Sequence, residues 1–300
     1  MKISFEEYQQ SASYTQLCGH RIAHWQSGAR DESKESILMI HGFPSAAWDW
    51  HYQWINLAKA DQVITLDMLG FGLSDKPKTH CYSLIEQADI ITALLENKGI
   101  KSCHILAHDY GNSVAQELLS RHEANKLSFR ISSLCYLNGG LFADYHRPLR
   151  SQKLLKSPFG WVLSRLMGKA SLKKSFTQIF GPNTPPLEED LDILWRLLSL
   201  NDGQRVLPGL LQYIDERHVH GEGWIRSMQS TQVPLYFING VHDPISGQHM
   251  LDRYREIIPN PHTTALDVGH YPQLEAPEQV LSLYQAFVKL HKSKAGLLKE

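Results

Sequence analysis

Short apolar runs that alternate with helix-like stretches constrain the fold of this chain more than any other feature. Strand-like runs at residues 36–40, 62–66 and 104–107 are separated by stretches with helical spacing at residues 48–58 and 83–98. Alternating strands and helices form a parallel sheet with right-handed crossovers and helices on both faces. The chain is therefore expected to be an α/β protein.

This alternation stops after a strand expected at residues 131–137 and resumes at residues 233–238. Between them, leucine and tryptophan recur at helical spacing. Turn-forming residues interrupt the spacing at three places: residues 158–160, 181–183 and 201–203. We interpret residues 140–229 as a helical lid inserted into a core domain that comprises residues 1–139 and 230–300.

Composition narrows the classes of function. The 300 residues include 30 Lys and Arg against 31 Asp and Glu, so no global field attracts nucleic acid. No apolar run approaches the roughly 18 residues of a membrane-spanning helix, and the N-terminus lacks signal-peptide features. We expect a cytoplasmic monomer or homodimer with no nucleic-acid partner and no transmembrane segment. The four cysteines show no CxxC spacing, and we expect reduced thiols.

A tight turn after the strand at residues 104–107 carries the first candidate catalytic residue. Ala107 and Gly111 lie two positions before and after Asp109, and small residues at this spacing permit a sharp strand-to-helix turn. The central residue is then pushed out above the sheet. In the serine version of this elbow that residue is the nucleophile, and here it is Asp109. The alternative is that Asp109 only caps the following helix.

Further signals favour a nucleophile. His41–Pro44 follows the first parallel strand, where a backbone N–H can join the amide of Tyr110 in an oxyanion hole. Asp243 lies in the loop after the first strand beyond the lid, and His270 lies in the loop after the last strand. Loops at the carboxyl ends of parallel strands converge on one crevice. Order and placement therefore predict a triad of nucleophile, acid and base.

These motifs resemble the α/β-hydrolase family, specifically its epoxide hydrolase and haloalkane dehalogenase branch, in which an aspartate replaces the elbow serine. The resemblance covers roughly residues 12–290 and rests on HGFP at 41–44, DMLGFGLSDKP at 67–77, HDYG at 108–111 and GHYPQLEAPE at 269–278. The lid motifs LNGG, HRP, NDG and LLQYI also resemble a vertebrate member of that branch. The resemblance implies a mostly parallel eight-stranded sheet flanked by helices, an inserted helical lid, and no metal or organic cofactor.

The resemblance also implies a role for each catalytic candidate. Asp109 matches the nucleophile, Asp243 matches the carboxylate that orients the base, and His270 matches the base. The backbone amides of Phe43 and Tyr110 match the oxyanion hole.

Two lid tyrosines are candidate substrate-binding residues. Tyr213 falls where epoxide hydrolases place a tyrosine that hydrogen-bonds the ring oxygen, although a core or helix-surface tyrosine is the alternative. Tyr145 is the candidate for the second such tyrosine. Asn138 stands where some dehalogenases carry their acid, and an amide there favours a different residue as the acid. Haloalkane dehalogenases usually have tryptophan and often a polar residue at the places of Tyr110 and Phe43, so halide would be poorly held here.

Together these residues predict a hydrolase that acts on an epoxide of an apolar or amphipathic small molecule through an alkyl ester on Asp109. An ionised carboxylate can displace an alkoxide from strained sp³ carbon, and water activated by His270 then hydrolyses the ester. The alternatives are a haloalkane dehalogenase, an esterase-type hydrolase, and a hydrolase-like protein that binds or regulates.

The lid segment from Tyr145 to Leu187 is strongly basic, in a chain that is otherwise balanced. It contains no Asp or Glu, and its basic residues are Arg147, Arg150, Lys153, Lys156, Arg165, Lys169, Lys173 and Lys174. This segment is either a solvated helical face, or it draws in an amphipathic anion or lies against an anionic membrane surface.

Overall fold

The computed structural model describes residues 3–28 and 35–297. Within these residues the strands form one eight-stranded sheet in the order β1-β2-β4-β3-β5-β6-β7-β8. The pairs β1–β2 and β2–β4 are antiparallel, and all other pairs are parallel. The strands are β1 (Ser13–Leu17), β2 (His20–Gln26), β3 (Ser36–Ile40), β4 (Gln62–Leu66), β5 (Ser102–Ala107), β6 (Arg130–Tyr136), β7 (Leu235–Gly240) and β8 (Thr263–Leu266). The predicted mostly parallel sheet is confirmed.

Helices connect and cover these strands. The α-helices of the described residues are α1 (Phe5–Gln10), α2 (His51–Leu57), α3 (Leu84–Asn97), α4 (Tyr110–Glu123), α5 (Arg150–Lys156), α6 (Gly160–Leu166), α7 (Lys169–Ile179), α8 (Glu188–Ser199), α9 (Leu207–Leu210), α10 (Tyr213–Ser230), α11 (Gln248–Ile257), α12 (Pro272–Glu275) and α13 (Pro277–Leu297). The 3₁₀ segments are η1 (Ala47–Trp50), η2 (Ala143–Tyr145) and η3 (Leu200–Val206). The helix expected at residues 48–58 is thus divided into η1 and α2.

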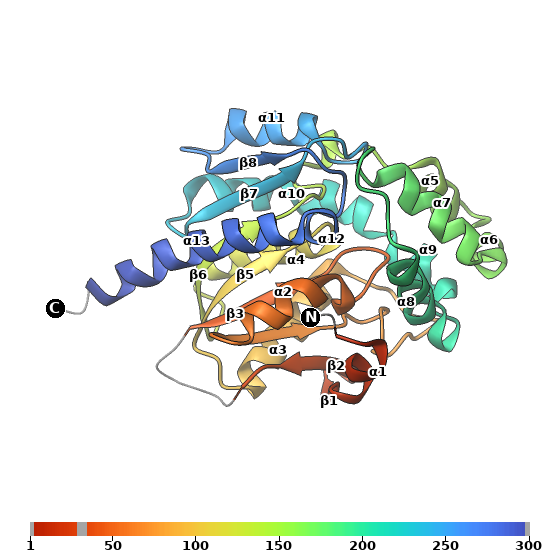
Figure 1. Cartoon of the computed structure of the whole chain (residues 1–300), viewed down its shortest axis with the longest axis horizontal. Coiled ribbons are helices and arrows are strands. Elements are labelled where there is room, and N and C mark those ends of the chain that lie inside the picture. The colour runs from red at the N-terminus through yellow and green to blue at the C-terminus, as the bar shows by residue number, and fades with distance from the viewer. Residues whose placement is uncertain (1–2, 29–34, 298–300) are drawn as a thin grey trace.

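The two faces of the sheet belong to separate hydrophobic cores, because successive side chains of a strand point to opposite faces. On β3, Leu38 and Ile40 pack into the core that contains α3 and α4. Met39 packs into the other core, where Tyr284 and Phe287 of α13 lie. Figure 1 views the sheet from the side that α2 and α13 cover. Burial on both faces explains why these strands are continuous apolar runs in the sequence.

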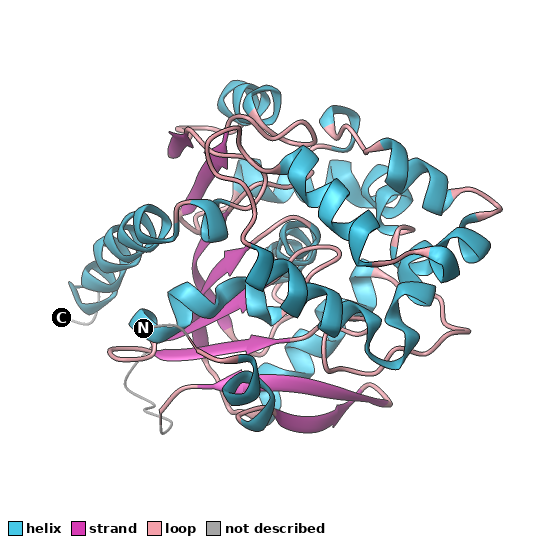
Figure 2. Ribbon diagram, turned by 45° about the vertical axis from the view of Figure 1, so that its right-hand side comes forward, coloured by secondary structure: helices cyan, strands magenta, loops and turns pink. Residues whose placement is uncertain are grey.

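Every element between β6 and β7, from η2 to α10, is a helix or a 3₁₀ segment. We call this region the helical insert. Helices α5 to α8 of the insert gather beside one end of the strands (Figures 1 and 2), whereas α10 runs back along α4. The three predicted interruptions are confirmed: residues 158–160 separate α5 from α6, residues 181–183 lie between α7 and α8, and residues 201–203 lie in η3, where Asn201 and Asp202 have positive φ. That residues 140–229 form a lid domain distinct from the core stays a prediction.

Across residues 3–28 and 35–297, no helix combines the length and the apolar character needed to cross a bilayer. The cytoplasmic location and the monomeric or homodimeric state stay predictions.

Candidate active site

Asp109 lies at the sharp turn between β5 and α4, with φ of 48° and ψ of −106°. Non-glycine residues rarely adopt positive φ, and such strain concentrates at functional sites. A Cβ atom on Gly111 would lie 2.5 Å from the carbonyl oxygen of Ile40, so the turn requires glycine there. The Asp109 side chain makes no capping hydrogen bond to α4. Asp109 thus occupies the N-cap position of α4 without capping the helix through its side chain.

The structure brings Asp109, Asp243 and His270 together, and all three are buried. His270 Nδ1 lies 2.7 Å from Asp243 Oδ2, and His270 Nε2 lies 4.0 Å from Asp109 Oδ1. Asp243 also accepts hydrogen bonds from the Ser246 hydroxyl at 2.6 Å and from Asn138 Nδ2 at 3.1 Å. These bonds hold the carboxylate that orients the imidazole. Asn138 is therefore a hydrogen-bond partner of Asp243.

Mutual interaction perturbs the pKa values of His270 and Asp243 in opposite directions. Burial alone lowers the pKa of His270, but the charge of Asp243, its hydrogen bond and the charge of Asp109 raise this pKa to about 9. Burial alone raises the pKa of Asp243, but the charge and hydrogen bond of His270 lower it to about 2. The pair is therefore an imidazolium beside a carboxylate at neutral pH.

The backbone N–H of Phe43 donates a hydrogen bond of 3.1 Å to Asp109 Oδ2. This leaves Oδ1 as the oxygen that faces His270. Tyr110 is the first residue of α4, and its buried ring packs against Phe71 and Tyr213. Phe43 thus already contacts the oxygen that an oxyanion hole would stabilise, whereas the role of the Tyr110 amide stays a prediction.

Arg217 of α10 is a buried arginine beside Asp109 that the sequence did not single out. Its Nη2 donates to the backbone carbonyl oxygen of Asp109 at 3.1 Å and lies 3.8 Å from Asp109 Oδ1. Its Nε donates to the Ser113 hydroxyl at 2.7 Å, and Nη1 lies 3.3 Å from His146 Nδ1. Burial, followed by the charge of Arg217, lowers the pKa of His146 well below its ordinary value. A neutral His146 can accept this hydrogen bond.

A second buried histidine contacts the backbone of His270. His108 precedes Asp109, and its Nε2 lies 2.8 Å from the carbonyl oxygen of His270. Burial, with the charge of His270 second, lowers the pKa of His108 well below its ordinary value. Neutral His108 can therefore donate from Nε2 and hold the backbone of His270.

The helical insert is hydrogen-bonded directly to the loop that carries His270. The His270 N–H donates to the Ile179 carbonyl oxygen at the end of α7, at 2.8 Å. Glu275 Oε2 accepts from the backbone N–H groups of Gly181 and Gly269 at 2.7 Å and 2.8 Å. One carboxylate thus joins the insert to the His270 loop, and Glu275 lies within the GHYPQLEAPE motif.

Asp109 and His270 both line a cavity of about 300 Å³. Most of the other lining side chains are apolar. Helices α5, α6 and α7 contribute most of the lining residues, including Leu155, Leu163 and Phe176. The cavity is therefore suited to an apolar or amphipathic small molecule.

The two tyrosine candidates differ in their surroundings. Tyr213 is buried between Phe43 and Tyr110, with Gln152 Nε2 3.4 Å from its hydroxyl. Gln152 lines the cavity, whereas Tyr213 and Tyr145 are not among its lining residues. Tyr145 is 37% exposed. Tyr213 is thus in contact with a cavity-lining residue, and the structure does not bring Tyr145 to the site, because η2 places Tyr145 at the surface.

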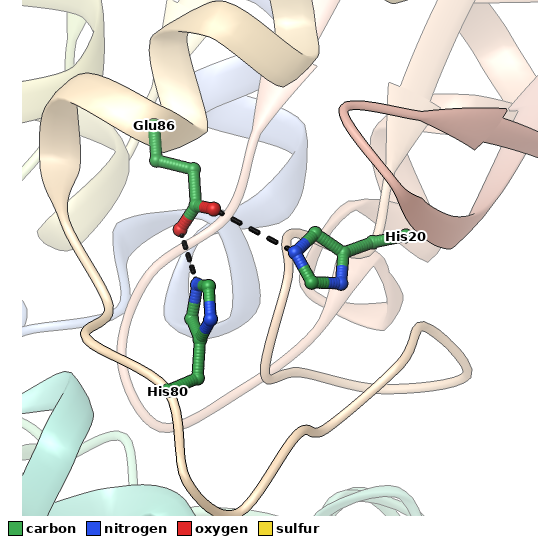
Figure 3. A group of neighbouring side chains, drawn as sticks. All are labelled: His20, His80 and Glu86. Atoms are coloured by element: carbon green, nitrogen blue, oxygen red, sulfur yellow. Dashed lines mark hydrogen bonds and ion pairs between the residues drawn. The ribbon is translucent and has the colours of Figure 1, made fainter.

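The described residues contain one group of side chains that could hold a metal ion: His20, His80 and Glu86. Figure 3 shows both imidazoles facing the Glu86 carboxylate. Nε2 of His80 lies 2.7 Å from this carboxylate and Nε2 of His20 lies 3.7 Å from it. These residues come from β2, the loop before α3, and α3, and none lines the cavity with Asp109. The carboxylate already interacts with both imidazoles without a metal.

The chain matches the alpha/beta hydrolase fold family over residues 35–277. The mesoderm-specific transcript protein of Mus musculus is 39% identical, over 95% of this chain and 88% of that protein. It is the vertebrate protein that the sequence motifs were predicted to resemble.

Two solved structures are similar in fold. The haloalkane dehalogenase DatA of Agrobacterium tumefaciens C58 has a TM-score of 0.78 and 18% identity, covering 93% of this chain and 96% of that chain. The epoxide hydrolase CorEH has a TM-score of 0.75 and 21% identity, covering 92% and 97%. At these identities the likeness shows the fold alone. The predicted resemblance to the α/β-hydrolase family is confirmed by the family match and the mouse relative.

Proposed function

The chain belongs to the α/β-hydrolase fold family, and from this membership we propose that it hydrolyses an epoxide of an apolar or amphipathic small molecule through an ester on Asp109. One observation carries the proposal: an aspartate occupies the elbow, lines an apolar cavity and has the Phe43 amide on one oxygen and the His270 imidazole near the other. A carboxylate in this position can attack sp³ carbon.

In the first step, Asp109 Oδ1 attacks a ring carbon of the epoxide. A bond forms between Oδ1 and this carbon while the bond from the same carbon to the ring oxygen breaks. The ring oxygen remains attached to the neighbouring carbon as an alkoxide and takes up a proton. Asp109 loses its negative charge and becomes a neutral alkyl ester.

The proton donor to the alkoxide is proposed to be Tyr213. Burial raises the pKa of this phenol, so it is protonated at neutral pH. Its hydroxyl lies 3.4 Å from Nε2 of Gln152, which lines the cavity. Tyr145 lies at the surface, so a single tyrosine performs the role that epoxide hydrolases divide between two.

In the second step, His270 first loses the proton that it carries in the free enzyme. Water then attacks the carbonyl carbon of the Asp109 ester while His270 Nε2 takes a proton from it. Negative charge develops on Oδ2, where the Phe43 amide is already positioned to stabilise it. Collapse of this intermediate breaks the bond between Cγ of Asp109 and the ester oxygen Oδ1, so Oδ1 leaves with the alkyl carbon as an alkoxide. His270 passes the proton that it took from water to the departing alkoxide, and the diol leaves. Asp109 retains the oxygen of that water, and the second proton of the water returns to the Tyr213 phenolate. Epoxide and water are thus converted to diol.

The test uses the full chain and a neutral aryl epoxide in ¹⁸O-labelled water. Repeated turnover is expected to place ¹⁸O in the peptide that contains Asp109. His270→Gln is expected to accumulate the alkyl ester, visible by intact mass, because the first step needs no base. Asp109→Asn is expected to form no adduct. The control is Asp144→Asn, which removes a highly exposed carboxylate.

Three results would refute the proposal. Label in the product with none in Asp109 excludes the ester. Halide release from a haloalkane at a higher kcat/KM than epoxide opening identifies a dehalogenase. Ligand binding in the cavity without turnover of epoxides, haloalkanes or aryl esters identifies a binding protein.

A further inference from the structure

The hairpin formed by α5 and α6 exposes an unusual concentration of large apolar side chains. Five of the eleven large hydrophobic residues that are strongly exposed in the described part of the chain lie on it: Leu154, Phe159, Trp161, Val162 and Leu166. Phe159 is 71% exposed, Trp161 60% and Leu166 77%. Figure 1 places this hairpin at the end of the molecule opposite the C-terminal end of α13. Such clusters mark interaction sites.

The same region carries an excess of positive charge. Of the eight basic residues between Tyr145 and Leu187, the lysines Lys156, Lys169 and Lys173 pair with Asp215, Asp192 and Glu188 of α10 and α8. In residues 3–28 and 35–297, the structure gives no carboxylate partner to the other five: Arg147, Arg150, Lys153, Arg165 and Lys174. The guanidinium of Arg165 stacks over the exposed Trp161 ring, 4.9 Å from its centroid. The apolar patch is thus flanked by uncompensated cations.

The apolar patch is continuous with the cavity of the candidate active site. Leu154 and Leu166 are strongly exposed, and both also line the cavity that contains Asp109 and His270. The mouth of the cavity therefore lies within the exposed apolar patch. A molecule that leaves an apolar phase at this patch would reach Asp109 without crossing water.

We propose that the α5–α6 hairpin docks on an anionic phospholipid bilayer. Aromatic side chains beside basic residues are suited to the membrane interface, where apolar groups enter the acyl boundary and cations remain at the headgroups. A second copy of the chain is a poor occupant, because a two-fold contact would place two sets of uncompensated cations face to face. Delivery of an amphipathic substrate from the bilayer rests on the proposed function, whereas docking itself does not.

The test is co-sedimentation of the full chain with vesicles of phosphatidylcholine alone or mixed with phosphatidylglycerol. We expect binding to the anionic vesicles that weakens steeply with salt, because exposed charges are screened over about 8 Å at physiological ionic strength. Neutralising Arg150, Lys153 and Arg165 together is expected to weaken partitioning about a hundredfold, at about fivefold for each basic residue. Brominated lipid is expected to quench fluorescence in the wild type and less in Trp161→Phe.

Matched controls separate the hairpin from general surface properties. Phe159→Ser with Leu166→Ser is expected to abolish binding, whereas Val219→Ser, at an equally exposed apolar residue of α10, is expected to leave it unchanged. Neutralising Lys101 and Lys126, exposed lysines outside the insert, is also expected to have little effect.

The other possible results distinguish the docking proposal from the proposed function. Equal binding by the hairpin variants and the wild type overturns the proposal, and so does absence of vesicle binding by an enzyme that hydrolyses soluble epoxides. In sedimentation, a dimer that dissociates in the Phe159→Ser variant would identify a second copy as the occupant and also overturn it. Vesicle binding without epoxide turnover would support docking and contradict the proposed function.

Discussion

Replacing Asp109 with asparagine is predicted to lower the pKa of His270. The charge of Asp109 is one of the interactions that raise this pKa to about 9. The variant removes that charge and keeps the shape of the side chain. The alkyl ester proposed as the intermediate is also neutral at this position, so the variant reproduces the electrostatic state in which His270 must act as a base.

The size of the change follows from one distance. His270 Nε2 lies 4.0 Å from Asp109 Oδ1. Two unit charges at this separation interact by about 1 kcal/mol at the dielectric constant of water and by about 4 kcal/mol at an effective constant of about 20. Because one pKa unit corresponds to about 1.4 kcal/mol, the pKa of His270 is expected to fall by about one to about three. It would then lie between about 6 and about 8.

The fall in the pKa of His270 affects the two half-reactions differently. At a pH below the His270 pKa of about 9, His270 of the free enzyme is an imidazolium and cannot accept a proton. Alkylation does not need this base, but hydrolysis of the ester does. Since ester formation lowers the pKa of His270, the hydrolysis rate is expected to rise with pH and level off below pH 9. Formation of the ester is expected to show no such rise.

NMR titration of ¹⁵N-labelled histidine measures this pKa in the wild type and in Asp109→Asn. The chain has 16 histidines, so His270→Gln identifies the signal. The control is Asp144→Asn, which removes an exposed carboxylate. The reasoning is refuted if His270 titrates at the same pH in Asp109→Asn and in the wild type.

Three other predictions follow from the site. Gly111→Ala should destabilise the fold by about 1–3 kcal/mol in chemical denaturation, because its Cβ would meet a backbone oxygen at 2.5 Å. Gly221→Ala, which meets nothing within 4 Å, should stabilise α10 by about 0.5–1 kcal/mol, and equal effects would contradict this account. Arg217→Met should slow ester formation at least about tenfold in single-turnover assays, because a charged hydrogen bond contributes about 1.5–3 kcal/mol. The exposed Arg226→Met is its control, and an unchanged rate would exclude a role for Arg217. Treatment with a chelator, or His80→Ala, should leave epoxide turnover unchanged, and a loss that added zinc restores would contradict the mechanism.

Much of the fold could be predicted because its physical causes are local. Strands buried on both faces must be continuous apolar runs, and the small residues around Asp109 are a steric requirement of the turn. Asp243 and His270 could be placed in one crevice because both follow parallel strands whose ends converge. The short helix α1 lacked such a signal. It is held by contacts distant in sequence, such as the hydrogen bond from the Tyr8 hydroxyl to Asp67 at 3.0 Å.

The helical insert was less predictable because its contacts depend on tertiary packing. An arginine four residues after Tyr213 looks like a solvated residue of an amphipathic helix, yet α10 packs against α4 and buries Arg217 beside Asp109. Conversely, Tyr145 has the residue type expected for a substrate contact, but η2 leaves it at the surface. Residue type and order identify loops at strand ends well, whereas the direction of a side chain in a packed helix depends on its partners.

Through Arg217, the helical insert supplies a positive charge close to the Asp109 carboxylate. An ionised carboxylate in an apolar cavity needs positive charge nearby. Asp109 has two cationic neighbours, His270 Nε2 at 4.0 Å and Arg217 Nη2 at 3.8 Å. The charge on His270 must be lost before water is activated, whereas a guanidinium remains charged throughout. Because Arg217 comes from α10 and is held by Ser113 of α4, a change that separates these helices is expected to slow ester formation even where the cavity walls stay intact.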